Sequence, residues 1–402
     1  MKSYAIHVSF LQCVTSIQHL VTSNYGLKTT NVKLFFMEWY LVSNIDTIDS
    51  PALLVYKQRV QYNIQQAVGM IKHLDKLRPH VKTNKIAEVC QLMMDAGIYK
   101  FKCATIAEAE MLGLLGAEDV LLAYQPVGPK IGRLASLFKK YPNTHFACLV
   151  DNLPNAQSIA AVFAAQGLTA DVYIDVNTGM DRSGIKPAGA FELVGHLQEI
   201  TGIQLVGLHG YDGHIRDSNV TDRQQKSDTA FGRLDDLQQQ IAIAYDKQLT
   251  LVTAGSITFP THLQRQNIEC SPGTFVFWDW GYKHLAADEP FELAALVITR
   301  IISIIDEKTI CTDLGHKSVA AENPMPRVHF LNAPDATPIA QSEEHLVAKV
   351  PDSSIYKVGD VLYGAPIHIC PTVALYERAM VIDGSEAVGE WKVVARDRKI
   401  TV

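Results

Sequence analysis

The sequence predicts a (β/α)8 barrel of the TIM type that is followed by an all-β domain. Between residues 57 and 285, β-type runs alternate with amphipathic helical patterns about eight times, which is typical of a parallel barrel. From about Pro290 the helical periods stop, and β-type runs follow one another between turn residues. A doubly wound open sheet is the alternative. No GxGxxG motif opens the first unit, which disfavours the dinucleotide-binding form of that sheet.

The elements can be justified in order along the chain. A strand, PALLVY, is expected at 51–56, and the helical pattern RVQYNIQQAVGMIKHLD follows it. Short apolar runs bounded by turn residues then give the barrel strands, which are expected at RPHVKT, YKFKCAT, DVLLAYQ, HFACLVD, DVYIDVN, QLVGLHGY, LTLVTAGS and NIECSPGTFVF. Helical patterns between them include IAEVCQLMMDAG, IAEAEMLGLLGA, PKIGRLASLFKKY and NAQSIAAVFAAQG. The β-type runs of the second domain are ELAALVITRIISII, TICTDLG, PRVHFLNA, TPIAQSEEHLVAKV, DVLYGAPIHI and EWKVVARD.

We expect four segments along the chain. Residues 1–36 lack the periodicity of the rest and are predicted to be a non-native or disordered extension, with Met37 as the true start. Residues 37–56 form an N-terminal strand segment, and the sequence leaves open whether its strand joins the β domain. The barrel is predicted at 57–285 and the β domain at 286–402.

Composition excludes several classes of protein. The net charge of −6 and the lack of a Lys/Arg cluster argue against a nucleic-acid partner. No apolar run is long enough to span a membrane. Seven scattered cysteines look like reduced thiols rather than a disulfide framework, which indicates a cytoplasmic protein.

Lys82 lies in the stretch RPHVKTNK, near the carboxyl end of the first predicted barrel strand. Barrels build their active sites at these ends, so Lys82 is a candidate Schiff-base lysine for pyridoxal phosphate (PLP). A surface lysine at a strand end is the alternative. Other residues follow the remaining strands and would converge on the same face of the barrel: His80, Gln125, Asp151, Asn152, Asn177, Met180, Asp181, Arg182, His209, Tyr211, Asp212, His214, Gly255, Ser256 and Thr258.

The segment AGSITFP, after the seventh strand, is a candidate phosphate site. Barrels often hold phosphate with the loops after strands seven and eight. Gly255 permits close approach of the backbone, and the hydroxyl groups of Ser256 and Thr258 can donate hydrogen bonds. An ordinary turn with the same residues is the alternative.

The second domain contains HICPT, in which His368 and Cys370 are two residues apart. In a strand both side chains would face the same side and could bind one metal. Imidazole and thiolate together suit Zn²⁺, and two protein ligands would leave positions open for water or substrate. A buried structural pair is the alternative.

These motifs together resemble the D-threonine aldolase and D-serine dehydratase family, whose PLP fold is that of alanine racemase. The likeness runs from about Met37 to the C-terminus and is carried by RPHVKTNK, NTGMDRSG, YDGH, AGSITFP and HICPT. The resemblance implies a PLP-bearing barrel, a β domain, a homodimer and a divalent metal, Zn or Mn, near the cofactor. By position it also implies that Lys82 forms the Schiff base, that Arg182 lies near the phenolic oxygen or the substrate carboxylate, that Tyr211 lines the cofactor, that Gly255, Ser256 and Thr258 hold the phosphate, and that His368 and Cys370 hold the metal.

Departures from the family's pattern bear on the reaction. Asn84 stands where the lysine motif usually has a histidine, and Cys370 gives the dehydratase version of the metal pair. His214, in YDGH, matches the aldolase side, where a histidine serves as base. We therefore favour a D-threonine aldolase-type lyase that cleaves small D-β-hydroxy amino acids, D-threonine giving glycine and acetaldehyde, with D-serine or D-threonine dehydration to a 2-oxo acid as the alternative. A racemase would need a base on each face and no metal, and a non-enzymatic PLP-binding protein would lack the long β domain.

Overall fold

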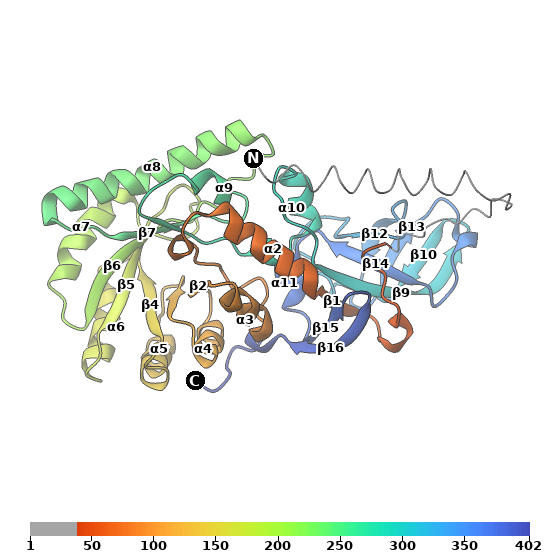
Figure 1. Ribbon diagram of the computed structural model, residues 1–402, viewed down its shortest axis with the longest axis horizontal. Coiled ribbons are helices and arrows are strands. Elements are labelled where there is room, and N and C mark those ends of the chain that lie inside the picture. The colour runs from red at the N-terminus through yellow and green to blue at the C-terminus, as the bar shows by residue number, and fades with distance from the viewer. Residues whose placement is uncertain (1–37) are drawn as a thin grey trace, which may run out of the picture. The chain divides into compact units, whose positions relative to one another are not determined.

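The computed structural model describes residues 38–402, and its first sheet consists of seven parallel strands. These strands are ordered along the sheet as they are along the chain, and helices alternate with them (Figure 1). The predicted extension at 1–36 and the predicted start at Met37 lie outside the described residues. The strands are β2 (Lys100–Cys103), β3 (Asp119–Leu122), β4 (His145–Val150), β5 (Ala170–Asp175), β6 (Ile203–His209), β7 (Thr250–Thr253) and β8 (Ile268–Cys270).

The segment at 77–80 comes before β2 in the chain and lies between β8 and β2 in space. It supplies the one remaining strand of the eight and closes the barrel. Leu77 forms a parallel bridge with Cys270 of β8, and His80 forms one with Lys102 of β2. The backbone N–H of Lys102 also donates to the carbonyl oxygen of Pro79 at 2.8 Å. The expected strand RPHVKT is therefore shorter than predicted, because the chain turns at 81–84. Together with β2–β8, this segment confirms the predicted barrel.

Seven helices follow the strand positions of the barrel. Local sequence explains the ends of α4 (Ile106–Leu115): the side chain of Thr105 accepts from the backbone N–H of Glu108 at its start, and Gly116, whose φ of 77° suits a residue without Cβ, follows its last turn. The long helix α8 (Val220–Tyr245) runs beside α7 (Pro187–Gln198) on the outside (Figure 1). The helices are α3 (Ala87–Asp95), α4 (Ile106–Leu115), α5 (Pro129–Lys140), α6 (Leu153–Ala164), α7 (Pro187–Gln198), α8 (Val220–Tyr245) and α9 (Phe259–His262).

The barrel interior has an apolar layer above an ionic one. The apolar cluster is made by Leu121, Ala147, Leu149, Tyr173 and Val252. At the amino-terminal end of the strands, the buried guanidinium of Arg78 binds Asp119 at 2.6 Å and Glu269 at 2.5 Å, and Lys100 binds Glu269 at 2.5 Å. Charges can be buried here because each has a partner of opposite sign.

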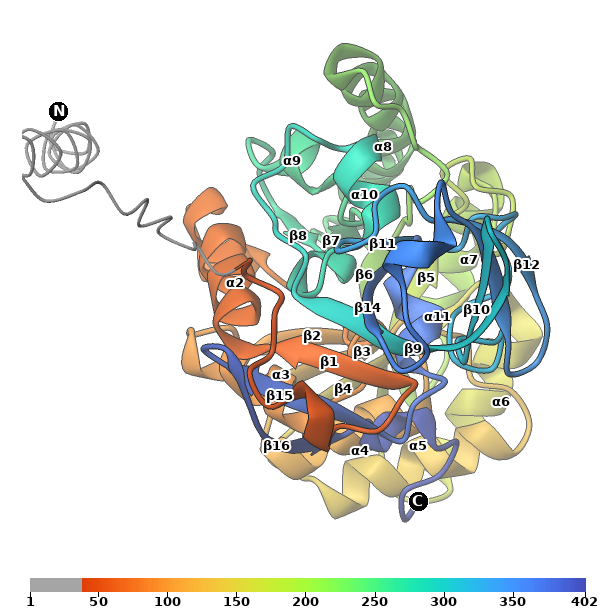
Figure 2. The ribbon, with the colours of Figure 1, turned by 90° about the vertical axis from the view of Figure 1, so that its right-hand side faces the viewer.

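The second sheet has nine strands and contains the N-terminal strand β1 (Ala52–Tyr56). This strand pairs antiparallel with β9 (Ala295–Asp306) and parallel with β15 (Arg378–Asp383), so it lies inside the sheet rather than at its edge (Figure 2). The helix α2 (Lys57–Met70) leads from β1 toward the barrel, and α10 (Trp280–Leu285) precedes β9. The remaining strands are β9 (Ala295–Asp306), β10 (Thr309–Thr312), β11 (Val328–Phe330), β12 (Thr337–Gln341), β13 (Leu346–Lys349), β14 (Val361–Pro366), β15 (Arg378–Asp383) and β16 (Glu386–Lys392).

The expectation that HICPT is part of a strand is wrong. Strand β14 ends at Pro366, and the segment Ile369–Val373 forms the short helix α11, with His368 as its N-cap residue. Pro371 explains the difference, since it lacks the N–H that a sheet ladder needs but is tolerated in the first turn of a helix. Strand β15 (Arg378–Asp383) was not expected from the sequence.

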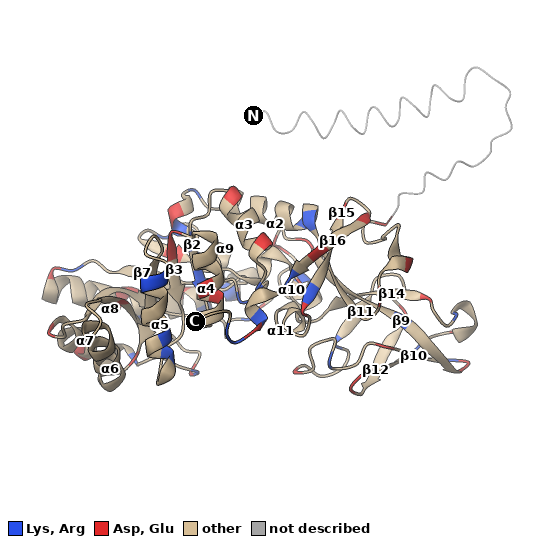
Figure 3. Ribbon diagram, turned by 90° about the horizontal axis from the view of Figure 1, so that it is seen from below, with Lys and Arg blue, Asp and Glu red and all other residues tan. Residues whose placement is uncertain are grey.

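The described part of the chain can be compared with the composition in its hydropathy, its charges and its cysteines. Within residues 38–402, no helix is both long and apolar enough to cross a bilayer. Basic and acidic residues are intermixed along the ribbon (Figure 3). The six cysteines of this part are free thiols.

Candidate active site

A cavity of about 540 Å³ lies between the carboxyl end of the barrel and helix α11. Its walls come from loops that follow the barrel strands and from the start of α11. Because those segments are far apart in the sequence, the cavity exists only in the folded chain. The predicted residues that line it are His80, Lys82, Tyr211, Gly255, Ser256, His368 and Cys370.

The two lysines of RPHVKTNK have different surroundings. The Nζ atom of Lys85 forms an ion pair with the fully buried Glu108. Lys82 forms no hydrogen bond or ion pair through Nζ within the described residues, and this atom lies 5.3 Å from the centre of the Tyr211 ring. Of these two lysines, only Lys82 therefore offers an uncommitted amine to the cavity.

Tyr211 is surrounded by cationic groups. The Cζ atom of Arg182 lies 5.2 Å from the centre of its ring, and the Nζ atom of Lys102 lies 5.6 Å from it. Arg182 is exposed and lines a small adjoining cavity that shares Tyr211 with the main one. The structure thus brings Arg182 close to Tyr211 but not into the cavity that Lys82 lines.

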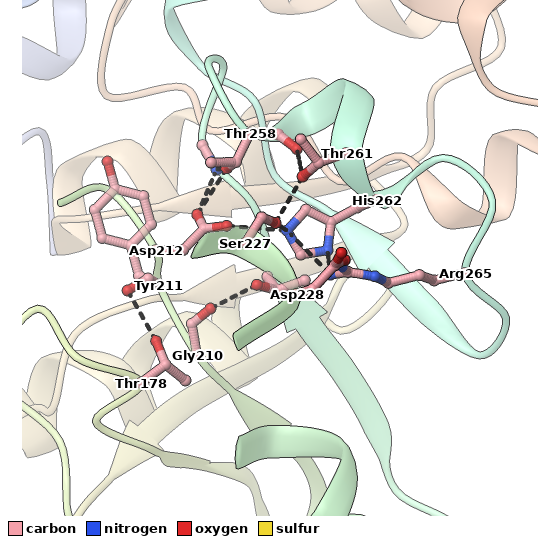
Figure 4. Close-up of polar contacts among 12 residues, drawn as sticks. Thr178, Gly210, Tyr211, Asp212, Ser227, Asp228, Thr258, Thr261, His262 and Arg265 are labelled. Carbon is pink, nitrogen blue, oxygen red and sulfur yellow. Dashed lines mark hydrogen bonds and ion pairs between the residues drawn. The ribbon is translucent and has the colours of Figure 1, made fainter. Parts of the chain in front are cut away.

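Asp212 anchors the loop that carries Tyr211 (Figure 4). Its Oδ1 atom accepts from the hydroxyl of Thr258 at 2.8 Å and from the backbone N–H of Gly255 at 3.2 Å, and its Oδ2 atom lies 2.9 Å from His262 Nε2. Burial favours the neutral carboxyl, but the hydrogen bonds with His262 and Thr258 hold the pKa of Asp212 below its usual value. The loops after β6 and β7 are therefore joined by a buried carboxylate.

The same network extends to α8. Arg265 donates to His262 Nδ1 at 2.5 Å, so we assign the ring proton to Nε2, which donates to Asp212. The hydroxyl of Ser227, on α8, lies 3.0 Å from this Nε2 atom and 2.6 Å from the hydroxyl of Thr261 (Figure 4). This packing fixes the position of the Tyr211 loop against the outer helix.

The predicted phosphate residues separate into two groups. Gly255 and Ser256 line the cavity, whereas Thr258 is buried and does not. The Ser256 oxygen accepts from the backbone N–H groups of Gly273 at 3.0 Å and Phe275 at 3.2 Å, which leaves its hydroxyl hydrogen to donate into the cavity. The Thr258 hydroxyl is already committed to Asp212, so its expected role in holding phosphate has no supporting contact.

His368 and Cys370 lie together at the start of α11. The His368 Nδ1 atom is 2.6 Å from Glu322, and the Cys370 sulfur is 3.2 Å from the Thr83 hydroxyl and 3.3 Å from the Thr274 hydroxyl. Burial opposes ionisation of Cys370, but its hydrogen bond with His368 outweighs this and lowers the pKa of the thiol. Within residues 38–402, no group of three or more His, Cys, Asp or Glu side chains is arranged to hold a metal. His368 and Cys370 could supply two ligands to a metal ion.

His214 lies away from this cavity. Its side chain is exposed and lines a different one, with Gly179 and Arg233. The backbone leaves Tyr211 on one side of the loop and His214 on the other. The predicted role of His214 as a base stays a prediction, without a contact that supports it.

The cavity also contains residues that sequence reasoning missed. Asp279 is buried and accepts from the backbone N–H groups of Tyr282 and Ile369, which joins α10 to the start of α11. Burial raises the pKa of Asp279 to about 6. Arg216 and Glu322 also line the cavity. No spacing signal identifies them, because their positions depend on how α10 and α11 meet.

Comparison with known proteins decides the family. A family model described as "Alanine racemase, N-terminal domain" matches residues 55–279, which is more than half of the chain. The chain belongs to this family. A second model, described as "Putative serine dehydratase domain", matches residues 294–382. These matches confirm the resemblance that the motifs indicate.

Two kinds of enzyme with a stated activity are similar to this chain in sequence and in structure. D-threonine aldolase of Arthrobacter sp. is 25% identical over 87% of this chain and 93% of its own length. The crystal structure of D-threonine aldolase from Filomicrobium marinum superimposes with a TM-score of 0.79 at 25% identity, over 87% of this chain and 95% of that one. D-threo-3-hydroxyaspartate dehydratase of Delftia sp. HT23 is 32% identical over 35% of this chain and 36% of its own. Its structure gives a TM-score of 0.77 at 21% identity, over 86% of this chain and 97% of that one.

Proposed function

We propose that this chain is a lyase, dependent on PLP and a divalent metal, that cleaves D-β-hydroxy amino acids and converts D-threonine to glycine and acetaldehyde. The observation that carries the proposal is that Lys82, Ser256 and the pair His368 and Cys370 line one cavity. The similarity to D-threonine aldolases over most of the chain supports the substrate class.

The lining of the cavity fits PLP. A Cβ atom on Gly255 would lie 3.3 Å from the Tyr211 ring, and one on Gly273 would lie 2.9 Å from the carbonyl oxygen of His80. A side chain at Gly255 would therefore crowd the Tyr211 ring, and one at Gly273 would crowd the segment from His80 to Thr83 that carries Lys82. Lys82 supplies an amine for covalent attachment, and the hydroxyl of Ser256 can donate to a phosphate oxygen.

When bound, PLP supplies a conjugated ring that takes up the negative charge left at Cα when a bond to that carbon breaks. The residues of the chain supply the remaining functions. The Tyr211 ring, fixed through Asp212, provides a flat face beside the Lys82 amine. The Lys82 amine can hold or return a proton at Cα.

The metal pair has a donor set that suits Zn²⁺ or Mn²⁺. His368 Nδ1 is engaged with Glu322, so Nε2 is the ring nitrogen left for a metal, and the Cys370 thiol has a lowered pKa. A cation held by these two residues would supply a Lewis acid to the cavity that Lys82 lines. It would leave open positions for the hydroxyl group of a substrate.

Dehydration to a 2-oxo acid is the second candidate, and two observations favour it. Cys370 is the dehydratase version of the second metal ligand, and His214, the expected aldolase base, lies outside the cavity. In dehydration the Lys82 amine would remove the proton from Cα, and no further base would be required.

A product assay separates the two reactions. Purified protein with PLP and D-threonine is assayed with and without EDTA, and both possible product pairs are measured. Glycine and acetaldehyde, lost on chelation and restored by Zn²⁺ or Mn²⁺, are the expected result. 2-Oxobutyrate and ammonia would establish the dehydratase instead, and neither pair from D-threonine or D-serine would refute the proposed lyase.

A further inference from the structure

Lys102 is a buried lysine that points into the barrel. On β2 it pairs with Leu121 of β3, and Leu121 belongs to the apolar cluster inside the barrel. Paired residues of neighbouring parallel strands face the same side, so the Lys102 side chain is also directed inward. It is only 1% exposed, and its Nζ atom lies 5.6 Å from the centre of the Tyr211 ring.

Lys102 has no counter-ion among the described residues. Lys100, two residues earlier on the same face, binds Glu269 at 2.5 Å, whereas Lys102 Nζ forms no hydrogen bond or ion pair within residues 38–402. An unpaired buried ammonium is unfavourable. Burial, and then the charge of Lys82, lower the pKa of Lys102 to about 7. Slightly above neutral pH, the amine is therefore mostly uncharged.

The acidic groups nearest Lys102 are engaged elsewhere. Asp175 binds His209 at 2.7 Å and Ser183 at 3.0 Å, and Asp212 is held by Thr258 and His262. The titratable and charged groups that act on Lys102 or face it are Arg78, His80, Lys82, Asp175, His209, Tyr211 and Asp212. None of them supplies an ion pair, and the cations among them disfavour a further positive charge.

We propose that Lys102 is a second cofactor-binding amine, which takes up a proton and becomes the counter-charge to an anionic oxygen of PLP bound beside Tyr211. The inference rests on the proposed function, because it requires that PLP binds in this cavity. An anion placed next to Lys102 favours its ammonium form, so binding of the anion and protonation of Lys102 are linked. The proton comes from solvent, and no covalent bond to Lys102 forms.

The test uses pyridoxine 5′-phosphate, which lacks the aldehyde and so cannot bond to Lys82. Titration calorimetry at pH 7.5, in buffers of different ionisation enthalpy, gives the number of protons taken up on binding. Wild-type protein should take up about three-quarters of a proton more than Lys102→Met, because an amine with a pKa of about 7 is partly protonated at pH 7.5 before the ligand binds. Lys102→Met should also bind about tenfold more weakly or worse, since a charge partner is lost. Lys102→Arg should keep the affinity without the extra proton, because its charge is permanent.

Lys130→Met is the matched control. Lys130 also lies over a tyrosine ring, 4.4 Å from the centre of Tyr124, but it is exposed and lines another cavity. Lys130→Met should leave the affinity for pyridoxine 5′-phosphate and the proton uptake unchanged. Pyridoxine, without phosphate, identifies the oxygen: an equal loss with both ligands in Lys102→Met assigns the ring oxygen, and a loss only with the phosphate ester assigns the phosphate.

Equal proton uptake and equal affinity in wild type and Lys102→Met would overturn the inference. Should Lys102→Met not fold, the comparison of wild type with Lys102→Arg decides it, and equal uptake again overturns it. Failure of the proposed function has a different signature. In that case PLP would give no yellow adduct with the wild-type protein or with either Lys102 variant.

Discussion

The Nδ1 atom of His368 lies 2.6 Å from a carboxylate oxygen of Glu322, so the imidazole is oriented by a residue 46 positions earlier. A carboxylate on one ring nitrogen fixes the tautomer and strengthens the other nitrogen as a metal ligand. This geometry was not accessible from the spacing of HICPT. It makes Glu322 the first residue to test.

Glu322→Ala should weaken zinc binding by about tenfold, the lower end of the range for such partners, because both side chains are half-exposed. Competition with a chromogenic chelator measures the affinity. Glu343→Ala is the control, since Glu343 is an exposed partner of Lys317 at 2.7 Å. Unchanged zinc affinity in Glu322→Ala would show that the carboxylate does not support the metal pair.

Borohydride reduction in the presence of PLP should label Lys82. Lys85 should remain unlabelled, because its amine is engaged with Glu108. Peptide mapping by mass spectrometry identifies the labelled residue. Lys82→Ala should lose the yellow absorbance, whereas Lys85→Arg should keep it. A label on Lys85 in wild-type protein would contradict the assignment.

Gly213→Ala should displace the Tyr211 ring. A Cβ atom at Gly213 would lie 2.2 Å from atoms of that ring, and overpacking of this kind costs about 1–3 kcal/mol. The expected result is PLP binding at least fivefold weaker, measured by absorbance titration. Gly232→Ala, on α8, is the control, because no atom outside its own helix lies within 4 Å of the added Cβ. Equal PLP affinity in Gly213→Ala and Gly232→Ala would mean that the Tyr211 ring does not contact the cofactor.

Glu289 should make the protein less stable as pH rises. Burial, and then the charge of Asp288, raise the pKa of Glu289 to about 8 in the folded state, against 4.5 for the free side chain. Between these two values the folded state binds more protons than the unfolded state, so the free energy of unfolding falls as pH increases, by a few kcal/mol in total. Glu289→Gln should remove most of this fall, as measured by urea unfolding at pH 5 and pH 8.5. Glu292→Gln, which alters a half-exposed partner of Arg59, should retain the wild-type slope.

Much of the fold followed from local patterns. Runs such as HFACLVD and DVYIDVN are apolar, β-branched and bounded by turn residues, and β4 and β5 form there. The segment at 77–80 was harder to define, because only isolated bridges hold it between β8 and β2. For β1, sequence could not choose a sheet, since its partners in β9 and β15 are hundreds of residues away.

For the site, the strand-end rule was sufficient where a side chain follows its strand directly. It placed Lys82, Tyr211 and Gly255 on one face of the barrel. The rule failed for His214, which comes three residues after Tyr211. The loop turns between them, so the His214 side chain lines a different cavity. Lys102 could have been found from alternation within YKFKCAT, which places Lys100 and Lys102 on the same inner face. Glu322 could not, because its contact with His368 depends on tertiary packing.

The position of β1 has a consequence for biosynthesis. Lys57, which directly follows β1, meets Asp383 of β15 across 326 residues of sequence. At about 5–20 residues per second, a ribosome needs roughly a quarter of a minute to a minute between making one and the other. During that time β1 has emerged with an unpaired edge, which is the kind of surface that recruits other strands. Nascent chains of this protein should therefore depend on chaperones until synthesis is nearly complete.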